Sequence, residues 1–252
     1  MCVANINMGA MRDNARALVA TGGDLPLLAD VSADGHGHGA VQAATAALEG
    51  GASWLSVSSV ADAATLRHAG IRAPILASFL AADQAQDAAS WGLAVRVPGV
   101  ELPRFFEPGI ALYGLGSDSI RWGVSPAMRV SARVVMTKAI GPGDGVSYGY
   151  TFRAASATNL AMVAIGYADG LDRSAGNVAS MLLGGTQRTI AGRVAMNAAV
   201  LDLGEDQSSV GEEAVLFGGA GEPSVRSWAS AIGISEDEVV TVFGRSLARS
   251  YR

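Results

Sequence analysis

The stretch Ala29-Asp30-Val31-Ser32-Ala33-Asp34-Gly35-His36-Gly37-His38-Gly39 places three closely spaced glycines between two different hydrophobic patterns. Leu25-Pro26-Leu27-Leu28, just before it, is typical of a short buried strand. Residues 40–48, just after it, repeat apolar side chains at helical spacing. Glycine lets a backbone approach a ligand closely, and the first N–H groups of a helix favour an anion such as phosphate. The alternative is a tight strand-to-helix turn that binds nothing.

The alternation of strand and helix continues through the first half of the chain. It predicts right-handed βαβ units and a parallel sheet. The segment Pro108–Gly114 is a candidate for one more strand. The expected strands are Val3–Ile6, Leu25–Val31, Ser53–Ser58, Ala73–Ser78 and Leu93–Val97, and the expected helices are Met8–Val19, Ala40–Leu48, Val60–Ala69 and Ala81–Trp91.

The pattern changes after about Ser117. Short apolar or alternating runs, separated by Gly, Pro, Asp and Asn, predict a mostly β domain. We therefore expect an α/β domain over residues 1–117 and a β domain over residues 118–252. The runs are Met128–Ile140, Leu160–Gly166, Ala179–Leu183, Gln187–Ile190, Val194–Leu203 and Ala214–Phe217.

Composition excludes several classes of function. Of the 252 residues, 50% are hydrophobic and 16% charged, which favours a packed core over disorder. The net charge of −5 and the scattered basic residues argue against nucleic acid and anionic membrane surfaces as partners. Cys2 is the single cysteine, so no internal disulfide forms and a reducing cytoplasm is expected. No apolar run reaches the roughly 18 residues of a membrane helix, and residues 1–10 do not read as a signal peptide.

Amine chemistry has a single side-chain candidate. Seventeen of the 18 basic residues are arginine, and the remaining one is Lys138. Lys138 lies in an expected strand of the β domain, ahead of Gly141-Pro142-Gly143. We expect it to face solvent.

Four segments, in this order and spacing, resemble the alanine racemase family. The resemblance implies a pyridoxal phosphate enzyme that has a TIM-like barrel followed by a β domain, interconverts the two forms of alanine, and forms a homodimer. It also implies that the fold here is a truncated TIM-like (β/α) barrel followed by a mostly β C-terminal domain. The segments are Asp34–Gly39, Val146–Phe152, Ile165–Arg173 and Gly192–Asn197.

Three residues receive roles from this resemblance. In the family, a lysine holds the cofactor as a Schiff base and acts as one base, and a tyrosine from the second subunit acts as the other. Tyr148 matches that catalytic tyrosine. Met196 matches the residue whose backbone N–H meets the substrate carboxylate, and Tyr167 matches a tyrosine that lines the active site. For all three, packing in the interior of the β domain is the alternative.

The chain also departs from the family pattern at four positions. Ser32 stands where the family has the Schiff-base lysine, and a serine hydroxyl cannot form an imine. His36 replaces the tyrosine that contacts the cofactor phosphate, and it is the cofactor-binding candidate. Asn197 replaces an aspartate, and Glu107 replaces an arginine.

A gap separates Trp91–Val97 from Pro108–Gly114, because the family carries several further strand–helix units there. About five barrel strands remain where closure needs eight. An incomplete barrel exposes strand edges that another chain or a rearranged sheet has to cover.

Three hypotheses for function follow. The first is an alanine racemase homologue whose catalysis is impaired by the loss of the lysine. The second is a racemase that binds pyridoxal phosphate without a covalent link. The third is a binding or assembly module that pairs through its β domain with itself or with an intact racemase. No metal site is expected, although His36 and His38 have the His-x-His spacing of some zinc ligands.

Overall fold

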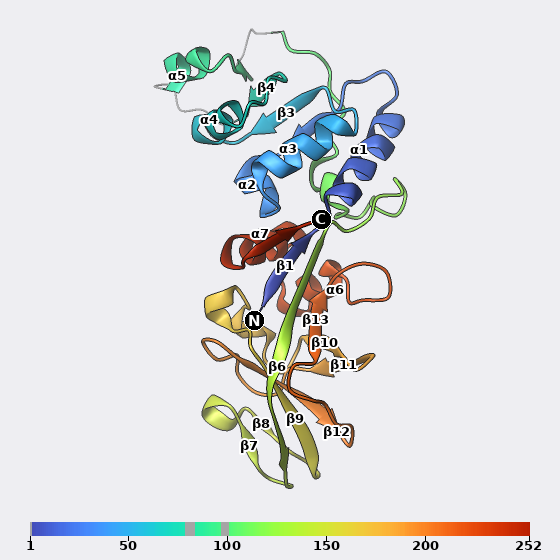
Figure 1. The fold of residues 1–252 in the computed structure, drawn as a ribbon, viewed down its shortest axis with the longest axis vertical. Coiled ribbons are helices and arrows are strands. Elements are labelled where there is room, and N and C mark those ends of the chain that lie inside the picture. The colour runs from blue at the N-terminus through green and yellow to red at the C-terminus, as the bar shows by residue number, and fades with distance from the viewer. Residues whose placement is uncertain (1, 79–83, 97–100) are drawn as a thin grey trace. The chain divides into compact units, whose positions relative to one another are not determined.

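The computed structural model describes residues 2–78, 84–96 and 101–252. Their contacts divide the chain into two compact units (Figure 1). The barrel unit comprises Ile6–Ala127 with Tyr251–Arg252, and the β unit comprises Met1–Asn5 with Met128–Ser250. Across the described ranges, no helix combines the length and the apolar character needed to cross a membrane.

The barrel unit contains the predicted parallel sheet, except that the expected strand Val3–Ile6 belongs instead to the sheet of β6 (Met128–Ile140) and β14 (Arg249–Tyr251). The four strands of the parallel sheet are hydrogen-bonded in chain order, β2-β3-β4-β5, and every pair is parallel. Helices alternate with these strands, as the sequence indicates. The strands are β2 (Leu28–Asp30), β3 (Trp54–Val57), β4 (Ile75–Ala77) and β5 (Ala94–Val95), and the helices are α1 (Met8–Gly22), α2 (Ser32–His36), α3 (Ala40–Glu49), α4 (Val60–His68) and α5 (Ala85–Ser90).

The centre of this sheet is apolar except at Ser56. Leu55 and Val57 in β3 and all three residues of β4 have no exposed surface. Near-continuous apolar strands are typical of a parallel sheet that is covered on both faces. Helix α4 begins where the Ser59 hydroxyl accepts a hydrogen bond from the Asp62 N–H, at 3.1 Å.

The sheet is open rather than closed. Within the described residues it has four strands, half of the eight in a complete (β/α) barrel. The outer edge of β2 is covered by the segment around Phe106. The Leu28 N–H donates to the Phe106 carbonyl at 3.0 Å, and the Phe106 N–H donates to the Pro26 carbonyl at 3.1 Å. This pairing satisfies backbone groups that a free edge would leave exposed.

The expected strand at 108–114 is wrong. Residues Gly109–Tyr113 form a 3₁₀ helix, η2, which begins after Pro108 and ends at Gly114, a glycine with φ 75°. Ala111, Leu112 and Tyr113 are buried, so the apolar run marks burial and not a strand. A short buried run does not distinguish a strand from a helical turn.

The β unit is built around the long strand β6 (Met128–Ile140), whose first half pairs with β13 and whose second half pairs with β9, both antiparallel (Figure 1). Two helices complete the unit, α6 (Val225–Ile232) and α7 (Glu236–Ser246). The remaining strands are β1 (Val3–Ile6), β7 (Gly145–Val146), β8 (Phe152–Arg153), β9 (Thr158–Val163), β10 (Ser180–Leu183), β11 (Thr186–Thr189), β12 (Ala199–Gly204), β13 (Glu213–Phe217) and β14 (Arg249–Tyr251).

Candidate functional site

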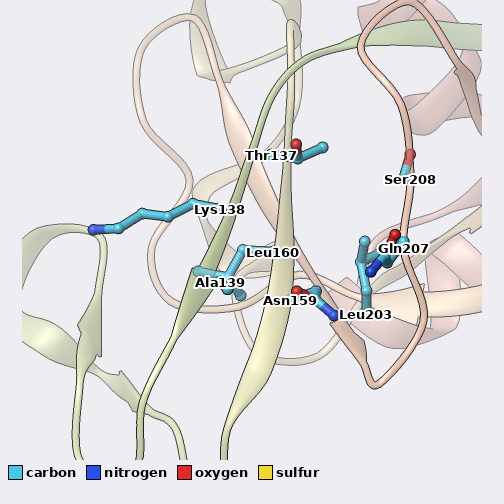
Figure 2. Close-up of a pocket in the computed structure, with 8 residues that line it drawn as sticks. All are labelled: Thr137, Lys138, Ala139, Asn159, Leu160, Leu203, Gln207 and Ser208. Carbon is cyan, nitrogen blue, oxygen red and sulfur yellow. The ribbon is translucent and has the colours of Figure 1, made fainter.

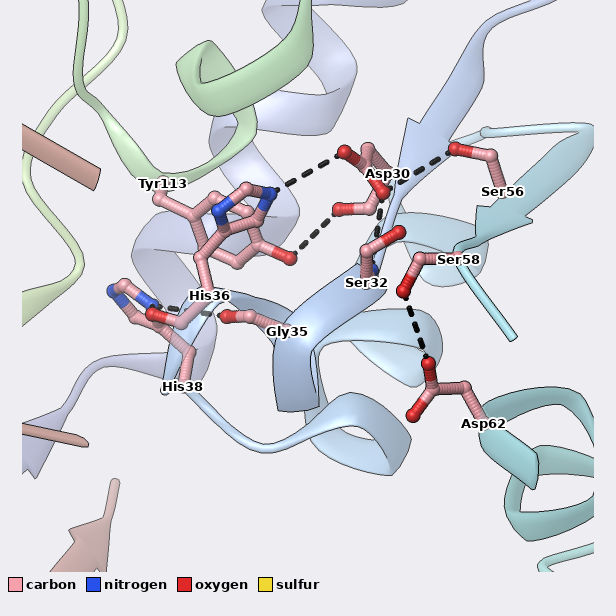
Figure 3. A network of polar contacts seen from close by, with 9 residues as sticks. All are labelled: Asp30, Ser32, Gly35, His36, His38, Ser56, Ser58, Asp62 and Tyr113. Atoms are coloured by element: carbon pink, nitrogen blue, oxygen red, sulfur yellow. Dashed lines mark hydrogen bonds and ion pairs between the residues drawn. The ribbon is translucent and has the colours of Figure 1, made fainter. Parts of the chain in front are cut away.

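Asp30, the last residue of β2, is the centre of a polar network (Figure 3). Its Oδ1 accepts the Ser32 N–H at 3.0 Å and the Ser56 hydroxyl at 3.3 Å, and its Oδ2 lies 3.3 Å from His36 Nε2. Burial raises the pKa of the Asp30 carboxyl, but the hydrogen bonds from His36 and Ser32 outweigh burial and hold the pKa below its ordinary value. Asp30 is therefore a carboxylate at neutral pH.

A left-handed turn brings His36 back to Asp30. Ala33, Asp34, Gly35 and His36 have φ values of 53°, 58°, 61° and 47°. Left-handed backbone costs about 1–2 kcal/mol for each residue that carries a Cβ. Such strain persists only where surrounding contacts over-determine the conformation, and it is concentrated at functional sites.

The glycine-rich turn lies between a strand and a helix, as the sequence predicts. The N-terminus of that helix, α3, already contacts a carboxylate of the protein itself. The Ala40 N–H, at the start of α3, donates to Asp34 Oδ1 at 2.8 Å. Asp34 thus occupies a place where an external anion would bind. The positive φ of Gly35, Gly37 and Gly39 serves the turn itself.

Two histidine rings flank the ring of Tyr113. The His38 ring stacks on it with centroids 4.4 Å apart, and the His36 ring is tilted against it at 5.2 Å. The Tyr113 hydroxyl donates to the Asp30 carbonyl at 2.8 Å, and burial raises the pKa of this phenol well above its ordinary value. His36 and His38 therefore serve this network. In the described part of the chain, no three His, Cys, Asp or Glu side chains gather as a metal site would require.

A cavity of about 420 Å³, here called the barrel pocket, lies beside Asp30. Ligands of parallel α/β sheets bind at the carboxyl ends of the strands, where these residues lie. Arg96 and Glu107 form an ion pair of 2.8 Å, and about half of each side chain is exposed. The polar lining consists of Asp30, Ser32, Ser56, Ser78, Arg96 and Glu107, to which Leu28 and Gly109 add apolar surface.

Tyr148, Tyr167 and Met196 lie in the β unit, on three segments joined by hydrogen bonds. We call residues 147–150, 167–168 and 193–196 the tyrosine segments. The Ser147 hydroxyl donates to the Arg193 carbonyl at 2.6 Å. The Tyr167 N–H donates to the Ala195 carbonyl at 3.0 Å, and the Ala168 N–H donates to the Met196 carbonyl at 2.9 Å.

Packing in the interior does not explain these side chains. Tyr148 is 72% exposed, Met196 54% and Tyr167 42%. Ser147 has φ 60° and ψ −172°, a backbone region that is essentially restricted to glycine and costs about 1–3 kcal/mol. The loop thus holds strained backbone while it exposes Tyr148. The catalytic and substrate-binding roles of these residues stay predictions, as does cofactor binding by His36.

Lys138 is exposed on β6, as expected. It lines two small cavities of the β unit, of about 160 and 180 Å³. Figure 2 shows its side chain extending away from Gln207 and Ser208, which line the smaller of the two cavities. The barrel pocket and the single lysine therefore belong to different units of the chain.

The sequence also carried a signal for the pocket that motif reasoning missed. Polar residues end or follow the apolar strands of the parallel sheet: Asp30 at β2, Ser78 after β4 and Arg96 after β5. Because parallel strands align their carboxyl ends, such residues are brought to one edge of the sheet. Asp30 and Ser78 could have been identified from this rule.

Comparisons with known proteins agree over most of the chain. Residues 6–102 match the family model "Alanine racemase, N-terminal domain", and residues 127–251 match "Alanine racemase, C-terminal domain". The alanine racemase of Salinispora tropica is 33% identical over 353 aligned positions that cover 95% of each chain. The chain has 252 residues, so a large part of that alignment faces a gap.

Solved structures show the same architecture. The alanine racemase of Streptomyces lavendulae matches with a TM-score of 0.90 and 27% identity, covering 100% of this chain and 97% of its own. The alanine racemase of Bartonella henselae, 17% identical with a TM-score of 0.86 and covering 100% of this chain and 99% of its own, was solved with covalently bound pyridoxal phosphate. Together the matches support a barrel-like N-terminal domain followed by a mostly β C-terminal domain.

The side chains that line the barrel pocket do not fit pyridoxal phosphate held covalently. An imine requires a primary amine, and Ser32 ends in a hydroxyl. A phosphate favours free cationic or N–H donors, but Arg96 is paired with Glu107, and the Ala40 N–H is occupied by Asp34. The lining carboxylates also add negative charge, which disfavours a phosphate further.

Proposed function

Because the chain belongs to the alanine racemase family, a family that depends on pyridoxal phosphate, we propose that it is a member without the lysine-based racemisation of its relatives. Ser32 in the barrel pocket is the observation that carries this proposal. The resemblance aligns Ser32 with the Schiff-base lysine. Lys138, the single lysine, lies in the β unit.

Two further features support the loss of catalysis. A side chain that takes up and returns a proton contributes about 10²–10⁴-fold to a rate, and a serine hydroxyl is too weak an acid and base to replace an amine. The parallel sheet also ends at four strands within the described residues, so the strand–helix units that complete a barrel wall are missing.

A racemisation assay tests the proposal. The chain and the alanine racemase of Streptomyces coelicolor are each incubated with L-alanine and pyridoxal phosphate, and D-alanine is measured. We expect a rate at least roughly 10³-fold below that of the Streptomyces enzyme. Lys138→Arg serves as a control. The D-alanine formed with this variant should equal the amount formed by free pyridoxal phosphate alone. A rate comparable with that of the Streptomyces enzyme would refute the proposal.

A second candidate function, pairing through the β unit, is favoured by the tyrosine segments. They expose Tyr148, Tyr150 and Met196 on a loop system whose backbone is strained at Ser147 and Tyr150. Exposed tyrosine and methionine are enriched at protein interfaces. We propose that this surface contacts a second copy of the chain or an intact racemase, in a reducing cytoplasm that suits a protein with one cysteine.

Light scattering after size-exclusion chromatography tests this pairing. The wild-type chain should elute as a dimer, or as a mixed species after addition of an intact alanine racemase. The double variant Tyr148→Ala/Tyr150→Ala should shift the mass towards the monomer. Val178→Ala, which changes an exposed apolar side chain outside the tyrosine segments, is the control. A wild-type chain that remains monomeric alone and with the racemase would exclude the pairing.

A further inference from the structure

We propose that the barrel pocket binds a small organic ammonium ion that carries hydroxyl groups. This proposal does not depend on the loss of racemisation, because it rests on the charge and shape of the pocket. The pocket has a volume of about 420 Å³. Pockets of roughly 300–1,000 Å³ with a few convergent polar groups are typical sites for small molecules.

The Asp30 carboxylate supplies the charge. Within the described residues, its Oδ1 accepts two hydrogen bonds and its Oδ2 contacts the His36 ring. A carboxylate offers about four acceptor positions, so Oδ2 can accept a further donor. Nearly a third of the Asp30 side chain is exposed, at 32%, and it lines the cavity. A primary ammonium, a compact cation with three donors, matches this acceptor.

The Arg96–Glu107 pair makes the pocket less favourable to anions. Each of these two charges neutralises the other at 2.8 Å, which leaves Asp30 to set the sign of the field. An anionic ligand would have to separate the pair to reach the guanidinium, whereas a cation binds at Asp30 with the pair intact. Because about half of each side chain is exposed, separating the pair costs little, so the pair makes a modest contribution against anions.

Three serine side chains of the pocket favour hydroxyl groups on the ligand. Ser32 lies two residues after β2, Ser56 lies within β3, and Ser78 directly follows β4. All three line the cavity. A hydroxyl both donates and accepts hydrogen bonds, so it complements a hydroxyl of the ligand. Interiors of (β/α) barrels are usually filled with bulky branched side chains, whereas the wall here carries three serine hydroxyls and borders a cavity.

Matched probes test the proposal by nuclear magnetic resonance. The chemical shift of the Ser32 amide reports directly on binding at Asp30, because the Ser32 N–H donates to the Asp30 carboxylate. Ethanolamine should shift this amide saturably. Ethylene glycol, which replaces the ammonium by a neutral hydroxyl, should bind roughly tenfold more weakly or worse. Inorganic phosphate should leave the amide unchanged, and L-serine, which adds a carboxylate to ethanolamine, should bind more weakly than ethanolamine.

Variants then locate the site. Asp30→Asn should weaken ethanolamine roughly tenfold or more, because a charged hydrogen bond is lost. Ser56→Ala should weaken it less and is the milder variant if Asp30→Asn folds poorly. Ser58→Ala is the matched control: Ser58 follows the same strand, but its hydroxyl donates to Asp62 of α4 (Figure 3). It should leave the affinity unchanged.

The proposal is overturned if ethanolamine and ethylene glycol bind equally, or if phosphate binds more tightly than ethanolamine. It is also overturned if ethanolamine leaves the Ser32 amide unmoved, or if Asp30→Asn and Ser56→Ala bind it as tightly as Ser58→Ala does.

Discussion

The barrel unit and the β unit both contain strained backbone, but the strained segment turns its side chains inwards in the first unit and exposes them in the second. In the barrel unit, left-handed residues from Ala33 to His36 fold polar side chains back onto Asp30 and α3. In the β unit, strain at Ser147 and Tyr150 accompanies tyrosines that face outwards, 72% exposed at Tyr148. In the barrel unit the strained segment places polar side chains in internal contacts, and in the β unit it leaves tyrosine side chains exposed. Strained backbone therefore accompanies inward-facing polar contacts in the barrel unit and exposed tyrosines in the β unit.

The largest effect on stability should come from the two cores. Phe217 in the β unit and Leu55 in the barrel unit are fully buried. Phe217→Ala should cost about 3–5 kcal/mol and Leu55→Ala about 2–5 kcal/mol, because each leaves a cavity. Urea unfolding measures both, and hydrogen exchange assigns each loss to its unit. The exposed Val135→Ala should stay within about 0.5 kcal/mol of the wild type. A Phe217→Ala variant as stable as Val135→Ala would contradict the core described above.

Acid should weaken the β unit through Glu213. Hydrogen bonds from Arg129 lower the pKa of Glu213 to about 2, against the opposing effect of burial. A carboxyl with a depressed pKa stabilises the fold above its ordinary pKa of about 4.5, and this stability is lost as the pH falls towards about 2. Glu213→Gln should therefore flatten the decline of the urea midpoint between these two pH values. The exposed Glu205→Gln is the control, and an equal decline in both variants would contradict the assignment.

The glycine turn of the barrel unit should tolerate a side chain poorly. Gly35 has φ 61°, and a Cβ there would lie 3.0 Å from the Cβ of Ala43. Gly35→Ala should cost about 1–2 kcal/mol from backbone strain alone, and more if Ala43 cannot yield. Gly70→Ala separates the two causes, because Gly70 also has a positive φ but has no atom within 4 Å of the added Cβ. Equal losses of free energy of unfolding would show that the close approach to Ala43 is not important.

The smallest effect should come from the helix end that Asp34 caps. Asp34→Ala should cost about 1 kcal/mol, because the Ala40 N–H loses its acceptor. Asp34→Asn retains an acceptor and should cost only a few tenths of that. Thermal unfolding of the two variants measures the difference. If Asp34→Ala is as stable as Asp34→Asn, the contact contributes nothing to α3.

Much of the fold could be predicted because its local signals are strong. Strand β6 has the predicted bounds, Met128–Ile140, and α3 extends one residue beyond the predicted helix. The predicted helix over 81–91 is confirmed from Ala85 to Ser90, while residues 81–83 lie outside the described residues. Helices α6 and α7 were missed, although Ser235 and Glu238 form a capping box that marks the start of α7. The short apolar runs of this half of the chain favour a mostly β prediction and do not locate these two helices.

The site was predicted only in part. Motifs pointed to Ser32 and His36, which contact Asp30, because resemblance depends on residue identity. They also pointed to Tyr148 in the β unit, whose role stays a prediction. Asp30 was missed as the centre of its network, since its partner Ser56 is 26 residues away in the chain and meets it only through the parallel pairing of β2 and β3. Contacts of this kind follow from topology, which a local pattern does not determine.

Reduction with borohydride in the presence of pyridoxal phosphate tests the absence of a covalent anchor most directly. The purified chain is mixed with the cofactor, its visible spectrum is recorded after gel filtration, and reduced peptides are mapped by mass spectrometry. We predict no retained imine band and no stoichiometric label, with traces confined to Lys138 or the terminal amine. A band that borohydride fixes at one cofactor per chain, together with D-alanine formation that Lys138→Arg abolishes, would contradict the account.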